Sequence, residues 1–120
     1  MTKLKPEMEI VYIESHLVDK TKVISINKEN GTAKLANGIV LNREILKKGY
    51  FKRAGIRSNA RAYIYEEGSE GYNIYEAYIN RIRLKSLLPT LKKAIETKDL
   101  ISDQGWLREL RGVIEKFIGQ

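Results

Sequence analysis

The amino-acid sequence predicts an α+β protein, in which a small antiparallel β-barrel or curled sheet is followed by two C-terminal helices. Two observations carry this prediction. Apolar and polar residues alternate through much of residues 8–41, where two Asn-Gly turns occur, whereas residues 106–118 carry a broad apolar stripe at helical spacing. A chain of 120 residues suits one domain. We expect a single domain of residues 1–120, with a β-rich barrel at about 5–85 and a helical packing segment at about 87–120.

The first strands are predicted from the period of the apolar side chains. In residues 8–14, Met8, Ile10 and Tyr12 occupy every second position, and residues 21–27 repeat the alternation. A period of two places one set of side chains on each face of a strand. We therefore expect two strands here, joined by a variable loop.

Two turns follow, at Asn30-Gly31 and Asn37-Gly38. The Asn-Gly pair accepts the positive φ angles that tight hairpin turns require. Turns only seven residues apart imply a meander of three short strands. Strands this short must curl into a small barrel or be covered by a helix to bury one face.

The middle of the chain is less regular. Residues 43–47 are expected to form a short helical turn, and Gly49 and Gly55 frame a loop. Residues 61–67 and 72–79 are rich in Tyr and Ile and are separated by Gly68-Ser69-Glu70-Gly71, which is typical of a hairpin.

A helix that starts near Ile74 is an alternative, because Tyr75, Tyr78 and Ile82 also fit helical spacing. Alternation that continues to Leu84 favours the strand.

Two helices are expected at the C-terminus. Pro89 suits the first turn of a helix over residues 88–98, and Ser102 or Asp103 can cap a second one. The second helix carries an apolar stripe at the spacing of a face buried on a core: Trp106, Leu107, Leu110, Val113, Ile114, Phe117 and Ile118.

The excess positive charge lies in one window. Residues 42–61 contain seven Lys or Arg and one acid, a net charge of +6, whereas the whole chain has a net charge of +7. A solvated surface is the alternative explanation for such a run, but a general lysine bias would not confine the excess to one place. Lys and Arg gain affinity for nucleic acid by releasing condensed counterions.

Composition excludes several classes. The chain has no cysteine, and therefore no disulfide and no thiolate metal ligand. The first ten residues lack the apolar region of a signal peptide, and no stretch reaches the roughly 18 apolar residues of a membrane span. We expect a cytoplasmic protein, or a nuclear one in a eukaryotic host.

The order of these elements suggests a family. Residues 5–46 combine a first strand, a variable loop at Glu14–Lys20 and two hairpin turns before Ile39-Val40-Leu41. This arrangement resembles the small SH3-like barrels of the Tudor and KOW type. The resemblance implies binding to nucleic acid or to methylated tails, and it assigns no individual residue.

The sequence therefore predicts a basic, non-enzymatic nucleic-acid-binding protein without cofactor or metal, largely independent of base sequence. A glycine-framed basic loop with an aromatic tip favours DNA over RNA, and a role in transcription or nucleoid state would follow. The expected contacts are Arg43, Lys47, Lys48, Tyr50, Phe51, Lys52, Arg53, Arg57, Arg61, Arg81 and Arg83. The last two would flank a sheet bearing Tyr63, Tyr65 and Tyr75, a second platform on which single strands could stack.

Two other classes of function compete with this one. A small phage or mobile-element adaptor would use the same loop to dock on an acidic host protein. A nuclease would need Glu66, Glu67 and Glu70 to hold Mg²⁺, but acids at a turn are commonly solvated. His16 is the only histidine, and it lies in a predicted loop, which favours a surface position over a general base.

Overall fold

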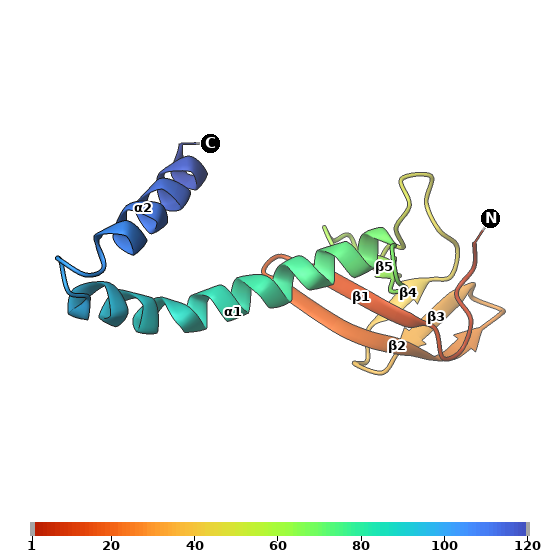
Figure 1. Cartoon of the computed structure of the whole chain (residues 1–120). Helices are drawn as coiled ribbons and strands as arrows, with labels where there is room; N and C mark the ends of the chain where they lie inside the picture. The colour runs from red at the N-terminus through yellow and green to blue at the C-terminus, as the bar shows by residue number, and fades with distance from the viewer. Residues whose placement is uncertain (1, 120) are drawn as a thin grey trace. The chain divides into compact units, whose positions relative to one another are not determined.

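The computed structural model describes residues 2–119, which form five β-strands and two α-helices (Figure 1). These elements are β1 (Glu9–Glu14), β2 (Leu17–Asn27), β3 (Thr32–Leu35), β4 (Val40–Asn42), β5 (Arg61–Ile64), α1 (Glu70–Thr97) and α2 (Gln104–Ile118). The predicted α+β class, with a curled antiparallel sheet followed by two helices, is confirmed. The chain divides into two compact units, one up to Asn80 and one from Arg81 onward.

The sheet has the order β4-β3-β2-β1-β5, and every pair in it is antiparallel. The long strand β2 pairs with two neighbouring strands. Its first half pairs with β1, from Glu14 opposite Leu17 to Glu9 opposite Lys22, and its second half pairs with β3. The pairing is irregular between Val23 and Ser25, and such an irregularity increases the local bend. The sheet therefore curls at β2.

The turns between the strands follow the sequence signals. Gly31 has a φ of +66° and Gly38 a φ of +91°, the left-handed conformation that the two Asn-Gly pairs predicted. The loop expected at residues 14–20 is shorter than predicted. Only Ser15 and His16 separate β1 from β2, because Ser15 itself adopts a positive φ of +54°.

Residues 51–53 connect the two edges of the sheet. Phe51 bridges to Ala62 of β5, and Arg53 bridges to Leu41 of β4. The amide of Phe51 donates to the carbonyl of Ala62 at 2.8 Å, and the amide of Asn42 donates to the carbonyl of Lys52 at 2.8 Å. One short segment thus satisfies backbone groups on both edge strands, which favours the curled shape.

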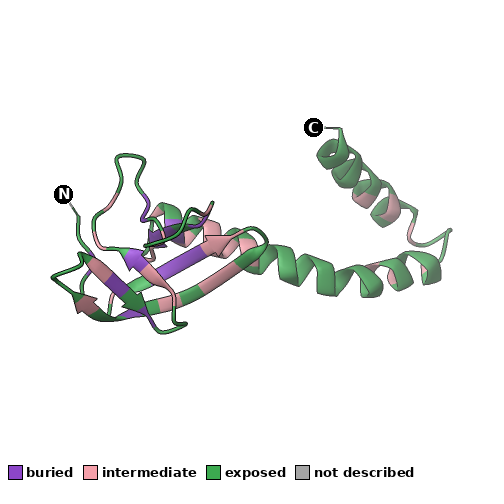
Figure 2. Ribbon diagram, turned by 180° about the vertical axis from the view of Figure 1, so that it is seen from behind, coloured by how far each residue is buried: buried purple, intermediate pink, exposed green. Residues whose placement is uncertain are grey.

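The hydrophobic core lies inside this curled sheet, where Figure 2 shows the buried residues. Tyr12 and Phe51 are its largest completely buried side chains. The full cluster is Leu4, Ile10, Tyr12, Val23, Ala33, Leu35, Leu41, Phe51, Ala60 and Ala62. It draws on every strand, so the sheet forms one packed unit.

The predicted hairpin of residues 61–67 and 72–79 is wrong. β5 ends at Ile64, and α1 begins at Glu70. The cause is Ser69, whose Oγ accepts a hydrogen bond from the amide of Tyr72 at 3.1 Å, as a helix N-cap does. Gly71 then lets the first turn approach β5, because a Cβ there would lie 2.4 Å from the carbonyl oxygen of Ile64.

The first C-terminal helix starts earlier than predicted. Pro89 was expected in its first turn, but α1 runs continuously from Glu70 to Thr97 with Pro89 inside it. Proline there cannot donate the usual amide hydrogen bond. The rest of the helix tolerates this local loss.

α2 confirms the predicted second helix, but the expectation that its stripe is buried on a core is wrong. No described residue of α2 is buried. Trp106 is 38% exposed and Phe117 is 76% exposed. Just before α2, the carboxylate of Asp99 accepts hydrogen bonds from the amides of Ile101 and Ser102, and these bonds lower the pKa of Asp99. They fix the turn between the helices.

Candidate nucleic-acid interface

The basic window forms the loop between β4 and β5. Residues 46–50 make a tight turn instead of the helical turn expected at residues 43–47. In this turn the amide of Leu46 donates to the carbonyl of Tyr50 at 2.9 Å, and the amide of Gly49 donates back to Leu46 at 2.9 Å. Gly49 has a φ of +93°. Lys47 and Lys48 consequently lie at an exposed tip.

The loop continues with side chains of alternating burial. Phe51 is buried and Arg53 is half-buried, whereas Lys52 between them is exposed. A second bend follows, where Gly55 has a φ of +79° and Arg57 is exposed. The backbone pairing of residues 51–53 therefore fixes which cations of the loop reach solvent.

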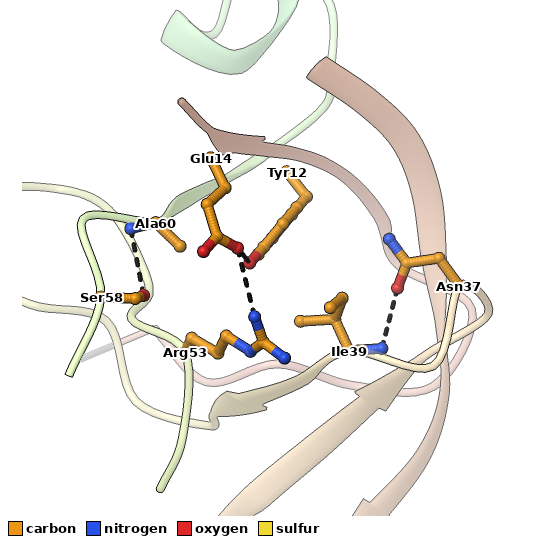
Figure 3. Close-up of polar contacts among 7 residues, drawn as sticks. All are labelled: Tyr12, Glu14, Asn37, Ile39, Arg53, Ser58 and Ala60. Carbon is orange, nitrogen blue, oxygen red and sulfur yellow. Dashed lines mark hydrogen bonds and ion pairs between the residues drawn. The ribbon is translucent and has the colours of Figure 1, made fainter. Parts of the chain in front are cut away.

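Arg53 is committed to an internal contact. Its Nη1 lies 3.2 Å from Oε1 of Glu14, and the hydroxyl of Tyr12 donates to the same carboxylate oxygen (Figure 3). The side chains of Arg53 and Glu14 are each about 30% exposed. Burial, followed by the hydrogen bond to Glu14, raises the pKa of Tyr12. This network joins the basic loop to the end of β1.

Arg43 is also used within the fold. Its Nε donates to the carbonyl oxygen of Leu4 at 3.0 Å, and its amide donates to the carbonyl of Gly31 at 2.9 Å. Arg43 and Arg53 were both predicted as phosphate contacts. In the structure Arg43 holds the start of the loop and Arg53 holds its middle, and both are half-buried.

The aromatic residues of the window are not at its surface. Phe51 is 0% exposed and belongs to the core, so the prediction that its ring stacks on a base is corrected. Tyr50 is 7% exposed. One face of its ring is covered by the guanidinium of Arg61, 5.0 Å from the ring centroid, and the ring of Tyr63 lies 5.9 Å away. Stacking on Tyr50 would require Arg61 to move.

Five cations of the window remain exposed, and none of them takes part in an ion pair among residues 2–119. We call them the loop cations: Lys47, Lys48, Lys52, Arg57 and Arg61. Four of them lie in the loop between β4 and β5, and Arg61 is the first residue of β5. Because all five are exposed and no acid within residues 2–119 pairs with them, their charges are available to an external anion.

Shallow hollows beside Arg43 add cations that the sequence did not single out. Lys3 and Lys28 line one hollow of about 330 Å³ with Arg43, and Lys3 and Lys5 line another of about 570 Å³ with the same arginine. Lys3 also pairs with Glu44 at 3.6 Å. No local motif marks these lysines, because the fold brings them to the loop from distant parts of the sequence.

The predicted tyrosine platform takes a different form. Arg81 and Arg83 lie on α1 and are exposed, not in a sheet. Tyr63 is buried. The half-buried rings of Tyr65 and Tyr72 lie 5.5 Å apart, and Lys20, which no sequence signal marked, places Nζ 4.1 Å from the centroid of the Tyr65 ring. These contacts join the start of α1 to the end of β5.

His16 and the acids before α1 were the residues that the sequence offered for a catalytic or metal site. Across residues 2–119 no group of three or more His, Asp or Glu side chains could hold a metal ion. His16 is exposed in the β1–β2 turn, and Glu66 and Glu67 are exposed before α1.

Comparisons with known proteins found no family model, no curated protein and no solved structure that matches this chain. Neither α1 nor α2 is long and apolar enough to cross a bilayer, and these are the helices of the described residues.

Proposed function

We propose that the protein binds nucleic acid through the loop cations, without preference for base sequence. The observation that carries this proposal is the set of five exposed cations, four in the β4–β5 loop and Arg61 at the start of β5, which make no ion pair within residues 2–119. Cations that no internal acid neutralises gain most from phosphate contacts, because each contact releases counterions condensed on the nucleic acid.

The position of the charges argues for backbone contacts. Lysine and arginine side chains on an exposed loop can reach phosphates, and phosphate contacts carry no base information. The aromatic side chains of the window are buried or covered by Arg61. Electrostatic attraction to phosphates is therefore the main contribution to binding. Stacking on Tyr50 would be a secondary contribution after Arg61 moves to a phosphate.

The scaffold supports the same proposal. The curled sheet, with its edges connected by residues 51–53, is compatible with an SH3-like small barrel of the Tudor or KOW type. In this proposal Arg43 and Arg53 orient the loop, and Lys5 and Lys28 of the Arg43 hollows extend its positive surface. A protein of this kind would act on transcription or on nucleoid state by covering DNA.

The test is a titration of fluorescent random-sequence duplex DNA, followed by anisotropy at several salt concentrations. If the five loop cations each contact a phosphate, log K should fall with log[salt] with a slope of about −4 to −5. Random duplex RNA is titrated in the same way. A polyglutamate peptide of equal charge is the control for a purely acidic partner. Binding of polyglutamate with no binding of either nucleic acid at physiological salt would overturn the proposal and favour an adaptor function.

A further inference from the structure

Part of the apolar stripe of α2 stays exposed to solvent within residues 2–119. Leu107, Leu110 and Ile114 face Ile95 of α1 and line with it an apolar groove of about 230 Å³. The other edge of the stripe contains Trp106, Val113 and Phe117, with exposed fractions of 38%, 55% and 76%. A helix with two apolar edges normally has two neighbours. Within residues 2–119, α1 lies beside only the first of these edges.

The exposed edge, together with Leu110 at its border with the groove, has the spacing of a helix-pairing seam. Lys98 places its Nζ 4.7 Å from the centroid of the Trp106 ring, and a partner helix would displace it. Trp106, Leu110, Val113 and Phe117 are separated by four, three and four residues, which is the alternation of the a and d positions in a coiled coil. We call these four residues the α2 seam. The 3-4 spacing is that of one apolar face of a helix, and such a face packs well against a second helix.

The charges beside the seam fit a second copy of the same helix. In the a and d register just described, Glu109 and Lys116 occupy the g positions, which flank a helix pair. In an antiparallel pair related by a two-fold axis, Trp106 meets the partner's Phe117, and Leu110 meets the partner's Val113. The same register sets Glu109 opposite the partner's Lys116, and the symmetry repeats this pair.

We infer that α2 is a homodimerisation helix, which pairs antiparallel with α2 of a second copy through the α2 seam. Self-complementarity is what selects a second copy over another protein, because one helix supplies both members of each apolar layer and of each charge pair. The second unit also exposes Leu84, Leu87 and Leu88, and a standard interface buries roughly 800 Å² per partner.

Sedimentation equilibrium of the full chain tests the inference. The mass should approach twice the 13.8 kDa of one chain as concentration rises. Glu109→Lys and Lys116→Glu each turn two attractive pairs into two repulsive pairs, and each should weaken dimerisation about tenfold or more. Circular dichroism should show unchanged helix content, since Glu109 and Lys116 are exposed.

Mixing the two variants distinguishes this pairing from every other association. In the mixed dimer the two introduced charges, of opposite sign, face each other across the seam, and the unchanged Glu109 of one chain faces the unchanged Lys116 of the other. An equimolar mixture should therefore regain a dimer, visible as a mixed species in native mass spectrometry.

Arg108→Glu is the matched control, because it changes charge as Lys116→Glu does but lies off the seam, and it should leave the dissociation constant within about twofold. A chain that stays monomeric at about 100 μM, or variants that do not complement each other, would overturn the inference.

Discussion

Gly71 is the residue at which the first turn of α1 packs most closely against β5. A methyl group at this residue would lie 2.4 Å from the carbonyl oxygen of Ile64 and 2.9 Å from Cβ of Tyr63. Both neighbours belong to β5, whose backbone is hydrogen-bonded to β1, so neither can move away cheaply. Overpacking of this kind costs about 1–3 kcal/mol. The gain in helix propensity from Gly to Ala, roughly 0.5–1 kcal/mol, offsets only part of it.

We therefore expect Gly71→Ala to lower the free energy of unfolding by about 1–2 kcal/mol, measured by urea denaturation followed by circular dichroism. Asn73→Ala is the matched control, because Asn73 is exposed in the same turn of α1, and this change should be neutral or slightly stabilising. A Gly71→Ala variant as stable as the parent would refute the close approach of α1 to β5.

Two further predictions concern the Tyr12–Glu14–Arg53 network. Arg53→Gln leaves the half-buried carboxylate of Glu14 without its cation, and it should lower the free energy of unfolding by roughly 1–2 kcal/mol in urea denaturation. Arg57→Gln, at an exposed position, should change that free energy by less than about 0.5 kcal/mol. Equal effects of the two variants would contradict the assigned role of Arg53. The pKa of Tyr12 is raised above its ordinary value of 10.0, so its contribution to stability is complete below about pH 10 and is lost as pH rises through the higher folded-state pKa. Urea midpoints measured from about pH 9 to 11 should consequently fall less steeply in Tyr12→Phe than in the parent, and identical slopes would count against the shift.

The sequence correctly predicted the strands and turns that depend on residues close together in the chain. The alternation of Met8, Ile10 and Tyr12 and the two Asn-Gly pairs act within a few residues, and β1, β2 and their turns form where these signals lie. The start of α1 was missed although Ser69 is a good N-cap, because the apolar residues after it fit both a period of two and a helical period. The cap and the glycine at residue 71 decide between the two patterns only when β5 is in place.

The burial of Phe51 and the pairing of Arg53 depend on contacts between residues that are far apart in the sequence, so they could not be predicted from it. Phe51 lies in a charged window and looked exposed, but its backbone pairs with Ala62 and its ring fills the core. Arg53 differs from the loop cations only because Glu14, 39 residues earlier in the chain, meets it. The sequence thus located the basic loop, whereas the division into cations that hold the loop and cations that face solvent depends on the fold.

The central claim is that the loop cations, rather than the net charge of the protein, bind nucleic acid. The most direct measurement compares two triple variants that lose the same charge, Lys47→Gln/Lys48→Gln/Lys52→Gln in the loop and Lys85→Gln/Lys92→Gln/Lys93→Gln on α1, where all three lysines are exposed. Anisotropy titrations with random duplex DNA should show the magnitude of the salt slope reduced by about 2 to 3 for the loop variant, with affinity lost equally for all sequences, and little change for the α1 variant. Equal losses in the two variants, or a loop variant that binds as tightly as the parent, would contradict the claim.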